Sequence, residues 1–148
     1  MIPTKEFILS KLPKFKNEVV ILNHTQTIPD IKKGIAQSFE KDKKDYSKIC
    51  AYFVGSTVEQ TCKNVYDFLK ANVQNVTESA NLQTVKSPAA IIATGNTTGS
   101  DCKHYALFSA GILDAINRSG IQHIPIALRY CKFKQYSGGY MYHVYTVV

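Results

Sequence analysis

Apolar residues recur at helical spacing through the first half of the chain. After Pro29 they fall four positions apart, which predicts a first helix; the residues are Ile31, Ile35 and Phe39. A second set falls at i, i+3, i+4 and i+7 and predicts an amphipathic helix that ends near Gly55; these residues are Tyr46, Ile49, Cys50 and Phe53. The run of mixed charge at 40–45 separates the two sets, and we interpret it as a solvated junction between helices.

Two further helices are predicted around a long polar segment. Thr57 followed by Gln60 indicates a capping box, and an apolar stripe continues to about residue 72; the stripe is Val58, Cys62, Val65, Tyr66 and Leu69. Residues 73–100 are rich in Asn, Thr, Ser and Gly without sustained periodicity, so we expect a long loop, which is usually either functional or disordered. A buried helix is predicted from Cys102 to a C-terminal cap at Gly120.

Beyond Gly120 the apolar period falls to two, which predicts strands. Residues 124–131 alternate, a turn with Ser137 and two glycines follows, and residues 140–148 are aromatic and β-branched. The two segments predict an antiparallel hairpin. Residues 1–28, with the β-rich run 19–22, predict an N-terminal arm or edge strand. The order predicts an α+β fold in one domain, residues 1–148, with a helical N-terminal layer on a small antiparallel sheet.

Composition and charge narrow the classes of partner. The chain has 148 residues, which fits a single domain, and 18 Lys and Arg against 11 Asp and Glu give a net charge of +7. This charge favours anionic partners, but the lysines are scattered over the first seventy residues without a basic stripe of interleaved aromatics, so nucleic acid is the third choice. No apolar run approaches 20 residues and no secretory signal is visible, so we expect a cytoplasmic protein without a membrane partner.

The four cysteines do not form a recognisable metal or disulfide pattern. Cys50, Cys62, Cys102 and Cys131 include no C-x-x-C pair and no zinc-ligand spacing, and no phosphate-binding loop of the G-x-x-x-x-G-K type occurs. We therefore expect neither a metal nor a cofactor. Cys50 and Cys62 lie on apolar helix faces and are expected in the core.

Cys102 and His143 are the candidates for chemistry. Cys102 begins a predicted helix directly after a Gly-rich loop, where free N–H groups and the helix dipole stabilise a thiolate; a small buried residue is the alternative. His143 lies mid-strand on the face of Met141 and Tyr145, where a hydrogen-bonded core histidine is the alternative. If the final strand lies beside the Cys102 helix, the imidazole reaches the sulfur and forms a pair suited to acyl transfer.

Two segments together resemble a known family. Gly99-Ser100-Asp101-Cys102-Lys103-His104-Tyr105-Ala106, then a helix, a strand and Tyr142-His143-Val144-Tyr145, resemble the transglutaminase-like superfamily of papain-type cysteine enzymes over about residues 55–148. The resemblance implies a papain-like core with Cys102 as nucleophile, its N–H in an oxyanion hole and His143 as general base and acid. It also implies a protein or peptide substrate, whose amide is hydrolysed or transamidated through a thioester.

The sequence departs from this family in two respects. The family has an Asp on a strand after the histidine, whereas no acid follows His143 before Val148; the chain is a fragment, a Cys–His dyad, or inactive. The chain also contains no Trp, the residue that protein-crosslinking members use near the oxyanion, so hydrolysis is favoured over crosslinking.

Neighbouring residues supply further candidates for oxyanion or substrate contacts. Gln83 lies in the loop before the nucleophile and is either a hydrogen-bond donor to the oxyanion or substrate, or a solvated side chain. Tyr105 lies one turn after the thiol. Asp101 is a candidate as well, although an N-cap role is the better interpretation. We expect Lys103 and His104 to face solvent.

Two functions therefore stay open. The first is a transglutaminase-like cysteine acyl-transfer enzyme, and the second is a catalytically inactive member of the fold that acts as a binding or assembly module. The uncharged, β-rich strand at 142–148 would leave an edge that favours pairing, which predicts self-association or docking on a larger assembly.

Overall fold

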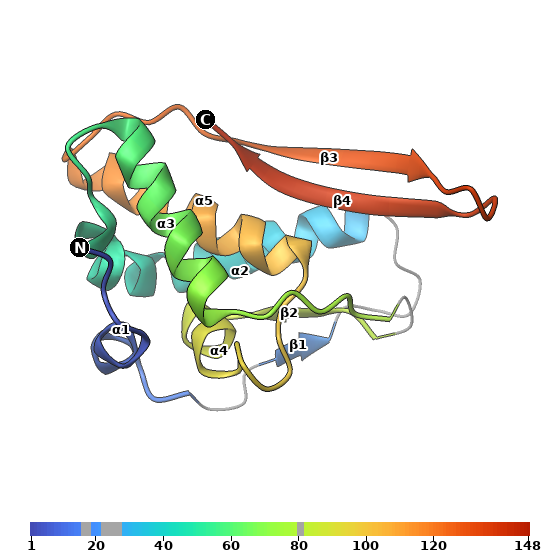
Figure 1. The fold of residues 1–148 in the computed structure, drawn as a ribbon, viewed down its shortest axis with the longest axis horizontal. Helices are drawn as coiled ribbons and strands as arrows, with labels where there is room; N and C mark the ends of the chain where they lie inside the picture. Colours follow the sequence, from blue (N-terminus) through green and yellow to red (C-terminus); the bar gives the residue numbers. More distant parts are fainter. Residues whose placement is uncertain (16–18, 22–27, 80–81) are drawn as a thin grey trace.

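The structure is a computed structural model that describes residues 1–15, 19–21, 28–79 and 82–148. A layer of helices packs against a β-hairpin that projects beyond it (Figure 1). The helices are α1 (Lys5–Lys11), α2 (Ile28–Ile49), α3 (Val58–Asn72), α4 (Pro88–Ala93) and α5 (Cys102–Ser119), with a 3-10 turn η1 (Cys50–Phe53). The strands are β1 (Val19–Ile21), β2 (Thr84–Lys86), β3 (Ala127–Lys134) and β4 (Tyr140–Val147). Both two-stranded sheets, β1–β2 and β3–β4, are antiparallel, so the predicted α+β class is confirmed. Among the described residues, no helix has the length and apolarity to cross a membrane.

Helix α2 is continuous where a junction was predicted. The run at 40–45 lies inside it, and pairs one helical turn apart hold the run together: Lys43 with Glu40 at 2.8 Å and Lys48 with Asp45 at 2.8 Å. Three residues of the run, Glu40, Lys41 and Lys44, are exposed to solvent as expected, whereas Asp42 is only 6% exposed. The helix passes through the run, so no junction is present. The junction interpretation was wrong because the run contains no Gly or Pro to end a helix. The second apolar set instead spans the end of α2 and η1, where Cys50 is buried as predicted.

Helix α3 forms where its cap and stripe predict it. The Thr57 hydroxyl accepts a hydrogen bond from the Gln60 N–H at 3.1 Å. The Gln60 side chain donates to Asn64 at 2.8 Å, so the second half of the capping box is absent. Tyr66, predicted in the buried stripe, is 59% exposed. Cys62 is half-buried and packs against the core.

The predicted loop at 73–100 contains two elements, so that prediction was wrong in part. The Ser87 hydroxyl accepts from the Ala90 N–H at 3.2 Å and caps α4, with Pro88 in the first turn, and the helix buries its small apolar residues. Three-residue strands such as β2 are too short to give a period, and a six-residue helix gives barely two turns.

The N-terminal segment forms a helix and a strand. Helix α1 was not predicted; it is capped by Thr4, and Ile8 and Leu12 are buried in the core. The expected edge strand is present at Val19–Ile21 and pairs with β2, Val20 lying opposite Val85. Residue 22 of the predicted β-rich run lies outside the described residues.

Helix α5 is central and buried, as predicted. Gly120 caps it with φ of 73°, a left-handed conformation that favours glycine. The Phe108 ring packs against three other aromatic rings, with centroids 6.0 Å from Phe68, 6.1 Å from Phe53 and 6.0 Å from Tyr46. This aromatic cluster joins α2, η1, α3 and α5 into one core.

Gly111 lets α5 approach the ring of Tyr46. A Cβ at this position would lie 2.5 Å from three ring atoms of Tyr46. We expect Gly111→Ala to lower the free energy of unfolding by about 1–3 kcal/mol, because overpacking outweighs the roughly 1 kcal/mol gained in helix propensity. Urea unfolding measures this. Gly139→Ala, whose Cβ meets only an ordinary contact at 3.6 Å, is the control, and equal stability of the two variants would contradict the packing argument.

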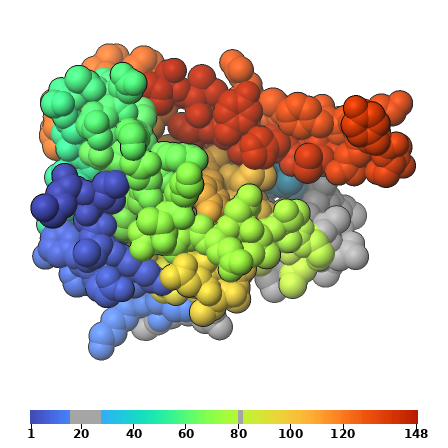
Figure 2. All heavy atoms as spheres, viewed as in Figure 1, coloured from blue at the N-terminus to red at the C-terminus, as the bar shows by residue number. Residues whose placement is uncertain are grey.

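Strands β3 and β4 form the predicted antiparallel hairpin, with Cys131 opposite His143. Strand β3 starts at Ala127 and not at Ile124, because the main-chain groups of Ile124 form hydrogen bonds with a side chain of α5. The Ile124 N–H donates to the Asn117 side chain at 2.6 Å and the Ile124 carbonyl accepts from that side chain at 2.7 Å. Helix α5 packs on β4, where Val144 is buried, and the tip of the hairpin extends beyond the helices (Figures 1 and 2).

Candidate functional site

A cleft of about 690 Å³ lies between α3, α5 and β4. In Figure 2, α3 (green) and the C-terminal end of β4 (red) lie on either side of α5 (orange). The cleft is lined by the side chains of both predicted reactive residues, Cys102 and His143, together with mainly apolar side chains. The condition that the sequence left open, a final strand beside the Cys102 helix, holds in this structure, where β4 packs on α5.

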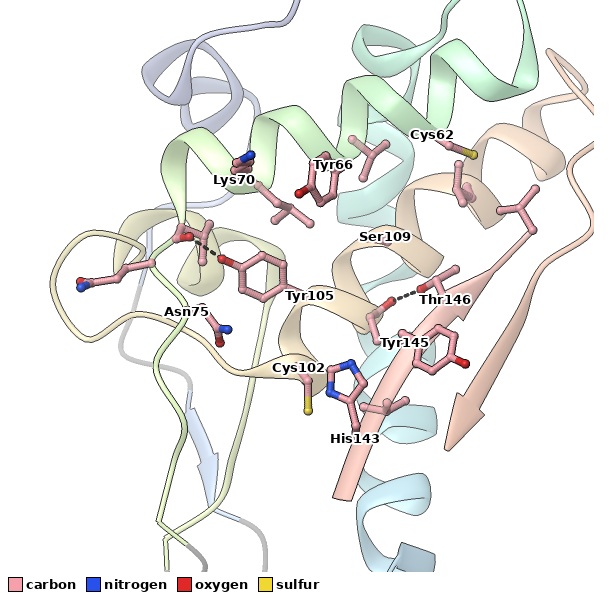
Figure 3. Close-up of a pocket in the computed structure, with 18 residues that line it drawn as sticks. Cys62, Tyr66, Lys70, Asn75, Cys102, Tyr105, Ser109, His143, Tyr145 and Thr146 are labelled. Carbon is pink, nitrogen blue, oxygen red and sulfur yellow. Dashed lines mark hydrogen bonds between the residues drawn. The ribbon is translucent and has the colours of Figure 1, made fainter. Parts of the chain in front are cut away.

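The side chains of Cys102 and His143 lie at the same end of the cleft (Figure 3). Cys102 is the first residue of α5 and is half-buried, while His143 is exposed on β4. The Thr146 hydroxyl donates to the Ala106 carbonyl at 3.0 Å, which ties β4 to α5 one turn beyond the thiol. The His143 ring also lies against Tyr145, at 5.7 Å between centroids.

The surroundings of Cys102 favour the neutral thiol. Burial raises the pKa of Cys102, and the negative charge of Asp101 raises it further. The N–H groups of Val144 and Lys103 and the charge of Lys103 act in the opposite direction, but the pKa stays above its ordinary value. This direction is opposite to the thiolate expected from the helix start alone, because desolvation outweighs the exposed N–H groups.

Lys103 and His104 are buried, so the prediction that they face solvent was wrong. Lys103 is only 2% exposed, and its ammonium donates to Glu78 at 2.7 Å and to Asp101. Glu78 in turn accepts from the Thr84 N–H at 2.7 Å and from the Thr84 hydroxyl. A buried ammonium between two carboxylates therefore joins the start of α5 to β2 and to the segment after α3.

Asp101 is the N-cap of α5, as the better interpretation predicted. It forms a capping box with His104, whose Nδ1 lies 2.9 Å from the carboxylate. The Asp101 N–H donates to His104 Nδ1 at 3.3 Å. Burial would raise the pKa of the Asp101 carboxyl, but the adjacent His104 side chain and the charge of Lys103 hold it below its ordinary value. The carboxylate does not line the cleft, so its role as a substrate contact is not supported.

Main-chain bonds fix the loop that precedes Cys102. Ser100 donates its N–H to the Gln74 carbonyl and accepts from the Val76 N–H, each at 2.9 Å. The Lys86 ammonium donates to the Gly99 carbonyl and lies 3.4 Å from the hydroxyls of Thr94 and Thr98. The segment at 74–76 and strand β2 thus hold the nucleophile loop in place.

Of the other two residues predicted to contact the oxyanion or substrate, Tyr105 lines the cleft and Gln83 does not. Gln83 donates to the main-chain carbonyls of Glu78 and Ser79 at 3.3 and 3.2 Å and does not line the cleft, so an oxyanion role for it is not supported. Tyr105 lines the cleft, and its hydroxyl donates to the Val73 carbonyl.

Two amides that sequence reasoning missed, Gln74 and Asn75, line the cleft. Asn75 lies on the same side of the cleft as the loop before the thiol, because its segment pairs with Ser100. No local pattern marks this pair, although both residues fall in the segment predicted as a functional loop.

One group of potential metal ligands occurs in the described residues. Glu78, Asp101 and His104 each offer a ligand atom, and these atoms lie within 4.8 Å of one another. Lys103 already donates to both carboxylates, so a divalent cation would have to displace a buried ammonium. We therefore assign this group a structural role.

The cleft contains no carboxylate that could orient His143. Its lining, drawn from the described residues, includes no Asp or Glu, and the residue opposite His143 on β3 is Cys131. The departure noted in the sequence thus persists in the fold: this part of the chain presents a thiol and an imidazole without an acid.

Comparison with known proteins returns no matching family model, no matching curated protein and no matching solved structure. The resemblance to transglutaminase-like enzymes, and with it the papain-like core, stays a prediction from the sequence.

Proposed function

We propose that the protein is a cysteine acyl-transfer enzyme that cleaves or transfers an amide through a thioester on Cys102. The observation that carries this proposal is the meeting of the Cys102 thiol and the His143 imidazole at one end of a cleft. The two residues are 41 positions apart in sequence, and the cleft beside them is large enough to hold a substrate side chain.

Because the thiol is neutral at rest, His143 acts as a general base during the attack. The sulfur bonds to the carbonyl carbon while its proton passes to His143. The carbon–nitrogen bond then breaks, and the amine leaves with that proton, so a thioester forms. Water or an amine adds to the thioester and gives a proton to His143. The carbon–sulfur bond breaks, and this proton returns to the sulfur.

Asn75 is our candidate for the donor to the oxyanion. Asn75 lines the same cleft as the thiol, on a segment that main-chain bonds hold against Ser100, two residues before Cys102. An amide donor fixed before the reaction stabilises the negative oxygen of the tetrahedral intermediate. Gln83, bonded to main-chain carbonyls outside the cleft, offers the matched control.

Acylation by p-nitrophenyl acetate tests the proposal, with the acetylated cysteine identified by peptide mass. At pH 7 we expect His143→Ala to slow acetylation of Cys102 at least tenfold, because the base is lost. We also expect Asn75→Ala to slow it, and Gln83→Ala to leave it unchanged. In His143→Ala the rate should rise through an inflection above about pH 8.5, because the pKa of Cys102 lies above that of a free thiol.

Cys62 is an internal control in every variant. It lines the same cleft, and burial raises its pKa as well, but it lies on α3 away from the imidazole. Its acetylation should not respond to His143→Ala. Equal acetylation of Cys102 with and without His143, while iodoacetamide still labels Cys102, would reject the enzyme and favour the binding or assembly module.

A further inference from the structure

The cleft meets β4 at its edge rather than at one of its faces. Four successive residues of this strand, from His143 to Thr146, line the cleft. Successive strand side chains point to opposite faces, so a cavity that touches all four in turn lies along the strand edge. The other edge of β4 pairs with β3, so the cleft lies on the unpaired edge.

The direction of a main-chain N–H supports this placement. At the turn, the Gln135 N–H donates to the Gly139 carbonyl at 2.8 Å, so main-chain groups point toward the partner strand at every second residue from Gly139 onward, including His143. The N–H of the next residue, Val144, therefore points away from β3. In an antiparallel pair the N–H and C=O of one residue point to the same side, and alternate residues point the same way. The N–H and C=O of Thr146 are therefore directed into the cleft as well. A strand edge with unpaired main-chain N–H and C=O groups can form hydrogen bonds with an added β-strand.

The walls of the cleft suit one extended apolar chain. The exposed apolar surface of the lining comes mainly from Tyr66 on α3, which is 59% exposed, and from Tyr145 and Val148 at the end of the chain, which are 36% and 55% exposed. Buried core residues of α3 and α5, such as Leu69 and Leu113, lie beneath this surface. Among the described residues that line the cleft, Lys70 is the only Lys, Arg, Asp or Glu. The Lys70 ammonium lies 5.7 Å from the centroid of Tyr66 and has no ion pair among the described residues. The cleft thus offers apolar walls, unpaired main-chain groups and one unneutralised cation.

We propose that the cleft binds a single extended apolar segment of another protein, which adds to β4 as a strand and places a carboxylate near Lys70. Main-chain hydrogen bonds to Thr146 supply affinity, and the apolar walls select the side chains. A second copy fits less well, because α3 stands beside the β4 edge along the cleft, and pairing of two β4 edges would bring a whole hairpin against it. The proposal concerns recognition and does not depend on chemistry at Cys102.

The test measures binding of a defined strand peptide by fluorescence anisotropy. The probe is fluorescein-labelled Glu-Val-Thr-Val-Thr-Val amide, used with the wild-type chain and with Cys102→Ala so that no reaction intervenes. We expect saturable binding to both proteins. N-methylation of alternate peptide nitrogens should weaken binding at least tenfold, because it removes the main-chain donors. Absence of binding, or equal binding of the methylated peptide, would overturn the proposal.

A matched pair of variants locates the binding. Ser109 lines the cleft and Ser119 lies exposed at the end of the same helix, so Ser109→Trp should reduce binding at least tenfold and Ser119→Trp should not. If Ser109→Trp fails to fold, hydrogen exchange of the wild type decides: peptide should slow exchange of the Thr146 amide. Unchanged exchange of the Thr146 amide, or equal peptide binding by both variants, would overturn the proposal. A dimer that is seen in sedimentation and that Ser109→Trp dissociates would also overturn it, and would show that the cleft binds a second copy of the chain.

Discussion

Replacement of Lys103 by methionine is expected to lower the free energy of unfolding by about 3–5 kcal/mol, since it removes the cation shared by two buried carboxylates. Glu78 and Asp101 would then face each other with like charges in surroundings that exclude water. Urea unfolding at pH 7 measures the change. Lys63→Met is the control, because Lys63 pairs with Asp67 on the exposed face of α3 and such pairs contribute less than about 1 kcal/mol.

The loss should also depend on pH. The pKa of Asp101 is held below its ordinary value in the folded protein, so this carboxylate contributes stability above about pH 4 that is lost as the pH falls through the lowered pKa. Below that pKa the carboxyl is neutral and no longer needs the ammonium. We therefore expect the difference between Lys103→Met and wild type to shrink in acid. A difference that does not vary with pH would contradict an electrostatic role for Lys103.

Phe108→Ala is expected to cost about 3–5 kcal/mol of unfolding free energy, because it opens a cavity at the centre of the aromatic cluster. The ring is fully buried and contacts the rings of Phe53, Phe68 and Tyr46 from three other elements, so no single side chain can move to fill the space. Urea unfolding measures the change. Phe133→Ala, on the half-exposed hairpin, should change stability by less than about 1 kcal/mol, and similar losses for both variants would argue against a cluster centred on Phe108.

The elements that the sequence predicted well are those that local signals define. Thr57 caps α3, Gly120 ends α5, and the period of two marks the hairpin. Each of these signals acts over a few residues and does not depend on the rest of the fold. Local signals also placed Cys102 at a helix start and His143 within a strand, but whether that strand packs on that helix is decided by tertiary contacts and stayed open in the sequence.

The remaining errors arose where distant residues decide the outcome. Lys103 and His104 are residue types usually found on the surface. The free-energy cost of burying the Lys103 ammonium is offset by an ion pair with Glu78, which comes from the segment after α3. Asn75 joins the cleft of the thiol through a main-chain pairing with Ser100 that leaves no pattern in the side chains. Charge partners and main-chain pairings across long separations are invisible to periodicity, which compares only near neighbours.

The pairing of β1 with β2 has a consequence for the order in which the protein assembles. Strand β2 carries Lys86, whose ammonium holds the loop before Cys102, and β2 pairs with a strand near the N-terminus. During synthesis, β1 leaves the ribosome long before its partner and stays without it until β2 emerges. Pairing of β1 with β2 closes a loop of more than sixty residues, and the entropy lost is offset only when the helices between the two strands have packed together. The environment of the thiol is therefore completed late in folding, after the core that surrounds Phe108.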